Sequence, residues 1–178
     1  MPRPPVTLAI AGAALALAAL PVAAQRPHLD LGGGASFPVG TLGDAQDAGW
    51  HALVAIGYRP PLSGLGFRLD GSYHRLHSPG TGDTPGRDFR ALAVTGNVVR
   101  EGPALAVRPY VLAGAGLYRT ELEGGEARTH PGATLGAGLR FHLLAVDAFV
   151  EARYHAMLDA LPGGGTGHLV PLTLGITF

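Results

Sequence analysis

Segments in which apolar and polar residues alternate recur along the chain after residue 25, each bounded by Gly, Pro, Asp or Asn. A period of two residues is the pattern of a β-strand with one face in an apolar environment, and no segment shows a capped pattern with the helical period of 3.6. The alternation predicts eight strands, at residues 28–37, 50–59, 65–77, 89–100, 105–119, 132–143, 147–157 and 168–178. The chain is therefore expected to be all-β.

The predicted connections between these strands alternate in length. Long connections are expected at residues 38–49, 78–88, 120–131 and 158–167, and a short connection lies between each long one and the next. In an antiparallel sheet, long and short connections then lie at opposite ends, as in a transmembrane barrel with short periplasmic turns and long extracellular loops. The expected fold is an eight-stranded antiparallel up-and-down transmembrane β-barrel with both termini on the periplasmic side.

Charged residues keep to one face of the predicted strands. In strand 65–77, Leu65, Phe67 and Leu69 share one face, and Arg68 and Asp70 share the other; strands 132–143 and 147–157 divide in the same way. A charge on the lipid face near the middle of the bilayer costs about 2–4 kcal/mol, so the charged face is assigned to the lumen. The residues expected in the lumen are Asp30, Arg59, Arg68, Asp70, Asn97, Arg119, Arg140, Glu151 and Arg153.

A barrel of eight strands has an interior only wide enough to be filled by side chains. Buried arginines and carboxylates avoid most of their desolvation cost when they are paired, and inward glycines leave room for the long arginines. We therefore expect a structural network of salt bridges, formed by Arg68, Asp70, Arg140, Glu151 and Arg153. A gated pore or a small-solute binding site remains the alternative.

Aromatic residues favour a membrane barrel over a soluble barrel or a lipocalin-like cup. Trp50 and Tyr58 lie eight residues apart on one face of a predicted strand, as do Tyr110 and Tyr118 on another. Eight residues of a strand tilted by about 40° climb roughly 20 Å, close to the height of the apolar band between two aromatic girdles. These four residues are expected to belong to the girdles.

The first 24 residues differ from the rest of the chain. Arg3 is followed by an apolar, alanine-rich run over residues 6–20 that contains no charge, and then by Pro21 and small residues at 22–24. The run is shorter than the roughly 20 residues of a membrane-spanning helix and leads directly into a signal-peptidase site. Residues 1–24 are expected to be a cleaved signal peptide and residues 25–178 the barrel domain.

Composition narrows the classes of function. Thirteen basic and thirteen acidic residues cancel, which gives no general attraction to nucleic acid, and the absence of Cys excludes disulfides and thiolate sites. The eight histidines are scattered without converging metal-ligand spacing, and they are expected to be solvated or at the edge of the lumen. Ser72 and His74, with Asp70 on the same face, could form a hydrolytic set, but that face points to the lumen, away from a lipid substrate. No enzyme activity and no cofactor are expected.

The chain resembles the small OmpA/OmpX-like superfamily of outer-membrane barrels, and in particular bacterial outer-membrane β-barrel domain proteins. The resemblance covers residues 26–178 and rests on residues 32–34 (GGG), 110–118 (YVLAGAGLY), 151–154 (EARY) and 171–178 (PLTLGITF). The final strand is similar to the C-terminal insertion signal of such proteins, in which Leu174, Ile176 and Phe178 share one face.

The resemblance implies a location in the cell outer membrane and insertion by the outer-membrane assembly machinery. The expected partners are outer-membrane lipid and lipopolysaccharide, and the protein is expected to be a monomer. The expected role is structural, in the integrity of the envelope, with loops exposed at the surface. A narrow channel or carrier for small solutes is the first alternative, and an adhesin or a lipid A-modifying enzyme is a weaker one.

Overall fold

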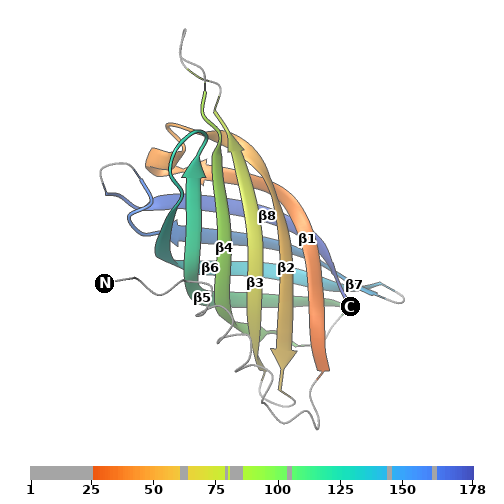
Figure 1. Cartoon of the computed structure of the whole chain (residues 1–178). Coiled ribbons are helices and arrows are strands. Elements are labelled where there is room, and N and C mark those ends of the chain that lie inside the picture. The colour runs from red at the N-terminus through yellow and green to blue at the C-terminus, as the bar shows by residue number, and fades with distance from the viewer. Residues whose placement is uncertain are drawn as a thin grey trace, which may run out of the picture.

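The chain forms a closed antiparallel barrel in the computed structural model, which describes residues 26–60, 64–78, 80, 86–103, 106–143, 146–161 and 164–178 (Figure 1). The strands are β1 (Arg26–Val39), β2 (Asp47–Arg59), β3 (Leu65–His77), β4 (Phe89–Glu101), β5 (Val107–Leu122), β6 (Arg128–Leu143), β7 (Val146–Met157) and β8 (Gly167–Thr177). The predicted fold class is confirmed. The predicted signal peptide lies outside the described residues.

Each strand pairs with its neighbours in the sequence, and β8 pairs back onto β1. At the seam, the backbone N–H of Leu29 donates to the carbonyl of Phe178 at 3.0 Å, and that of Phe178 donates to the carbonyl of Leu29 at 2.9 Å. A closed barrel satisfies its backbone hydrogen bonds between strands and leaves no sheet edge, which a strand protein needs in order to cross a bilayer.

The two ends of the barrel differ. One end carries the start of β1, the end of β8 and the short connections at residues 60–64, 102–106 and 144–145, and we call it the turn end. We call the opposite end the loop end. One long connection was predicted wrongly: the segment expected at 120–131 is a loop only over residues 123–127, because β5 and β6 continue beyond the apolar band and pair there, as in the match of Thr120 with Arg128. Within the described residues, no helix is long and apolar enough to cross a bilayer.

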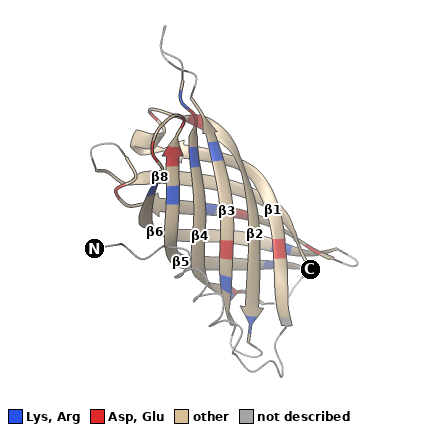
Figure 2. Cartoon of the chain, in the orientation of Figure 1, with Lys and Arg blue, Asp and Glu red and all other residues tan. Residues whose placement is uncertain are grey.

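The outer wall is apolar along the middle of the strands. Side chains such as Val94, Leu135 and Leu174 face outward, are not covered by other parts of the protein, and are between 49% and 67% exposed. Figure 2 shows charged positions as isolated bands on strands that are otherwise uncharged. Exposed hydrophobic surface of this extent is stable only against another apolar phase, which here is the lipid.

Three outward aromatic side chains, Trp50, Tyr73 and Tyr154, gather near the loop end, whereas Tyr58 lies near the turn end. The rings of Trp50 and Tyr73 are 5.6 Å apart, and Tyr154 stacks on His168 with ring centroids 5.4 Å apart. Such amphipathic rings concentrate where the apolar band meets the headgroups. This level therefore marks the outer boundary of the apolar band.

A cluster of apolar side chains closes the lumen at the loop end. We call it the apolar cap, and it consists of Leu42, Leu76, Phe89, Met157 and Leu169, all buried. Leu42 enters the barrel mouth from a short 3-10 turn, η1 (Gly40–Leu42), which no sequence pattern predicted. Gly40, the first residue of this turn, has φ +60°, a conformation that favours glycine, and this lets the chain turn back over the mouth.

Outside the apolar band, Asp88 links β3 to the start of β4. Its carboxylate accepts hydrogen bonds from Arg75 Nε at 3.0 Å and Nη2 at 2.8 Å. The hydrogen bonds from this guanidinium lower the pKa of Asp88 below its usual range. The carboxylate therefore stays charged, and the contact is kept in all but strongly acidic solution.

Candidate functional site: the polar interior

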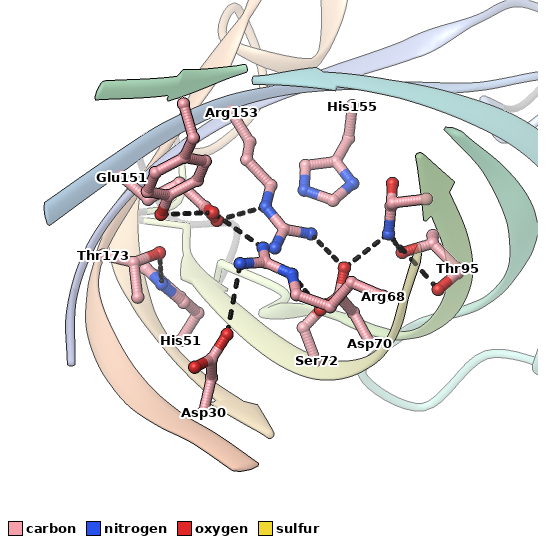
Figure 3. Close-up of polar contacts among 12 residues, drawn as sticks. Asp30, His51, Arg68, Asp70, Ser72, Thr95, Glu151, Arg153, His155 and Thr173 are labelled. Carbon is pink, nitrogen blue, oxygen red and sulfur yellow. Dashed lines mark hydrogen bonds and ion pairs between the residues drawn. The ribbon is translucent and has the colours of Figure 1, made fainter. Parts of the chain in front are cut away.

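In the middle of the lumen, four charged side chains from opposite walls form a closed ring of ion pairs. Arg68 and Asp70 come from β3, and Glu151 and Arg153 come from β7, four strands away around a barrel of eight. We call these four residues the charge ring (Figure 3). Each strand supplies one arginine and one carboxylate two residues apart, so the two side chains share a face. In both strands that face points into the lumen.

The charges alternate around this ring. Arg68 Nη2 lies 2.7 Å from Glu151 Oε2, and Arg68 Nε lies 2.8 Å from Asp70 Oδ1. Arg153 Nη1 lies 2.9 Å from Asp70 Oδ2, and Arg153 Nε also pairs with Glu151. All four side chains are at least 96% buried. The ring therefore ties β3 to β7 directly across the lumen.

Neighbouring groups complete the network and balance its charge. Asp30 on β1 lies 3.4 Å from Arg68 and 3.7 Å from Arg140, so three arginines face three carboxylates. Tyr110 donates a hydrogen bond to Glu151 at 2.8 Å. The structure thus places all five residues of the predicted lumen network in the interior, and it adds Asp30 and Tyr110 to them.

Glycines on β6 make room for this network. A Cβ on Gly136 would lie 2.9 Å from Cγ of Arg153, and a Cβ on Gly138 would lie 2.4 Å from the ring of Tyr110. These long side chains therefore lie flat against bare backbone. On the turn-end side of the ring, the space left among His28, Arg59, Arg68 and Arg140 is about 10 Å³, near the lower limit for one water molecule.

Three buried histidines form a second level, between the charge ring and the apolar cap. We call His51, His74 and His155 the histidine layer. His51 stacks on His74 with centroids 5.3 Å apart, and His74 meets His155 edge-on at 5.6 Å. The expectation that the histidines are solvated or at the lumen edge was wrong for these three, which are at least 96% buried.

Hydroxyl groups hold the histidine layer in place. Ser36 Oγ lies 2.9 Å from His74 Nδ1 and 3.2 Å from His51 Nδ1, and the hydroxyl groups of Thr173 and Tyr118 contact His51 Nε2 and His155 Nδ1. Buried imidazoles need such partners to offset their desolvation. The sequence signal was available in retrospect, because all three histidines share the inward parity of their strands.

The hydrolytic arrangement considered from sequence is only partly present. Ser72 Oγ lies 2.9 Å from His74 Nε2, but His74 Nδ1 contacts Ser36 and not a carboxylate. Asp70 is engaged by Arg68 and Arg153 instead. Both Ser72 and His74 are buried inside the lumen, so the pair lacks the orienting carboxylate and the access that a nucleophile requires. Among the described residues, no group of histidines and carboxylates has the geometry of a metal site.

Tyr110 and Tyr118 were wrongly assigned to the aromatic girdles. Both side chains point inward, with 3% and 2% exposure, whereas Trp50 is exposed on the outer wall and Tyr58 is partly exposed there. The same reversal applies to Arg119, which is exposed and shares the outward parity of Leu117. Both faces of β5 are largely apolar, so its alternation did not decide which face is inward; the phenol groups face inward because Glu151 and His155 bind them there.

Comparison with known proteins agrees with this architecture. A family model described as "Outer membrane protein beta-barrel domain" matches residues 7–173. No curated protein is a significant match to the sequence. Among solved structures, Neisserial surface protein A (NspA) is similar, with a TM-score of 0.68 and 18% identity over 87% of this chain and 98% of that chain.

A second similar structure is the N-terminal β-barrel domain of OprF from Pseudomonas aeruginosa. It has a TM-score of 0.50 and 18% identity, over 85% of this chain and 96% of that chain. At these identities the likeness shows the fold alone. Both structures support the eight-stranded barrel derived above.

Proposed function

Because the chain belongs to the outer membrane protein beta-barrel domain family, we propose that it is a structural protein of the outer membrane whose lumen is closed to solutes. Membership in this family confirms the resemblance seen in the sequence and indicates an outer-membrane location. By the topology of such barrels, the turn end then faces the periplasm and the loop end faces outward. The proposed role is to support the integrity of the envelope.

The charge ring is the observation that carries this proposal. A channel needs a continuous water-filled path, but Arg68, Asp70, Glu151 and Arg153 are paired across the lumen and fully desolvated. The histidine layer and the apolar cap fill the lumen above the ring. Opening a path would separate buried ion pairs, which is costly because each charge left alone is in a medium of low dielectric constant. This favours a structural role over the channel or carrier alternative.

Deleting the gene in its native bacterium tests the proposal. We expect the deletion strain to release more periplasmic enzyme into the medium and to become more sensitive to bile salts, because the membrane loses a rigid barrel. The wild-type gene should restore both properties. The variant Glu151→Met/Arg153→Met should restore them too, since it removes one charge of each sign and leaves the wall of the barrel unchanged. A deletion strain with an intact envelope but slower uptake of a small solute would show that the structural role is wrong.

The proposed partners follow from the location. Outer-membrane lipid and lipopolysaccharide would contact the apolar wall, and the assembly machinery would receive the last strand during insertion. Leu174 and Ile176 in β8, and Phe178 directly after it, all face outward and are at least 40% exposed. This exposure supports a role for them as an insertion signal.

A further inference from the structure

The outer wall is hollowed near the turn end, where β4 to β7 lie side by side. The hollow has a volume of about 540 Å³, and its lining includes Arg100, Val111, Ala137, Leu139, Val150 and Ala152. Val111, Leu139 and Val150 are each at least 40% exposed and stand around the small side chains of Ala137 and Ala152. The hollow is therefore an apolar depression in a surface that faces lipid.

The strand register shows how the hollow runs. Arg100 pairs with Val111, Val111 with Ala137, and Ala137 with Ala152. Continued around the barrel, the same row of partners reaches Trp50 at the loop end, so the row climbs across the membrane. Three strand spacings cover roughly 14 Å, which at a tilt near 40° rises roughly 9 Å from the rim toward the middle of the bilayer.

An outward-facing cation stands at the lower end of this row. Arg100 is exposed and projects outward, and none of the described carboxylates pairs with it. The one carboxylate beside it, Glu101, is already shared by Arg59 at 2.7 Å and Arg108 at 3.4 Å. Glu101 follows Arg100 on the strand and points to the opposite, inner face, so it leaves the positive charge of Arg100 uncompensated at the mouth of the apolar depression. This charge complements an anionic phosphate, which arginine binds with paired hydrogen bonds.

We propose that the hollow binds one anionic glycerophospholipid of the periplasmic leaflet. Its phosphate accepts hydrogen bonds from Arg100, and one acyl chain lies over Ala137 and Ala152 between the larger side chains. The turn end faces the periplasm, so the lipid comes from that leaflet. The proposal goes beyond the structural role and does not depend on whether the lumen is closed.

Native mass spectrometry of the purified protein, in detergent supplemented with phosphatidylglycerol, tests this site. The wild-type barrel should retain one lipid. Arg100→Gln should lower the retained fraction about tenfold, the effect of losing a charge-assisted contact, and Ala152→Phe should lower it by filling the depression. Arg119→Gln at the loop end and Ala52→Phe on β2, both at exposed outward positions, should leave it unchanged.

Folding of each variant is checked by its heat-dependent mobility in gel electrophoresis. If Ala152→Phe does not fold, Ala137→Val replaces it as the filling variant. The proposal is overturned if the wild-type protein retains no phosphatidylglycerol, or if the control variants lose it as much as Arg100→Gln does. It is also overturned if lipopolysaccharide, offered in a parallel titration, is the lipid whose retention depends on Arg100.

Discussion

Replacing Glu151 with glutamine is expected to destabilise the barrel by about 3–5 kcal/mol, the cost of leaving a buried charge without its partner. The variant keeps the size of the side chain but removes the carboxylate that Arg68 and Arg153 share across the lumen. Three buried guanidinium groups would then face two carboxylates. Urea unfolding, followed by the fluorescence of Trp50, the single tryptophan, measures the free energy of unfolding.

Two controls separate this effect from a general loss of charge. Asp147→Asn removes the carboxylate that pairs with the exposed His142 at the turn end, so it should change stability by less than about 1 kcal/mol. Glu151→Met/Arg153→Met removes a whole pair and keeps the lumen neutral, and it should lie closer to the wild type than Glu151→Gln does. If Glu151→Gln unfolds at the same urea concentration as the wild type and the two controls, the charge ring does not hold the barrel together.

Substituting arginine for Leu69 should cost about 2–4 kcal/mol, because it places a charge on the lipid face near the middle of the bilayer. Leu65→Arg should cost no more than about 1 kcal/mol, since the effect falls toward the interface. The two leucines make a matched pair: both lie on β3, face outward and are 41% exposed, and they differ only in depth. Unfolding of both variants in lipid vesicles provides the comparison.

An equal cost at the two positions would contradict the placement of the apolar band. A soluble barrel with its outer face in water would tolerate arginine at both sites. The depth dependence therefore tests the membrane location separately from overall stability.

Much of the fold could be predicted from the sequence, because lipid imposes a strict rule on one face of each strand. In β3 and β7 every charge near the middle falls on one parity, and the structure buries Arg68, Asp70, Glu151 and Arg153, which occupy that parity. The periodicity also located all eight strands. It could not determine which arginine meets which carboxylate, because that depends on the stagger between strands far apart in the chain.

The errors arose where alternation carries no information. On β5, Tyr110 and Tyr118 occupy one face and Val111 and Leu117 the other, so both faces are apolar. Only the partners across the lumen, Glu151 and His155, show which face is inward. The apolar cap was not predicted for a related reason. Near the loop end the inward faces of the strands are apolar, so in the sequence they resemble the outward, lipid-facing faces.

The hollow near Arg100 was also beyond prediction. Its alanines lie on two strands, and they meet only through the register that pairs Ala137 with Ala152. A single exposed arginine at a strand end is unremarkable in a sequence. Only its position at the foot of an apolar depression points to the phospholipid site proposed above.

Single-channel recording of the purified barrel in a planar lipid bilayer tests the central claim, that paired charges close the lumen. The wild-type protein should insert and show no conductance above that of the bare membrane, because the charge ring, the histidine layer and the apolar cap leave no continuous path for ions. A stable open state in the wild-type protein, altered by Glu151→Gln, would show instead that ions pass through the ring, and the closed barrel described here would be wrong.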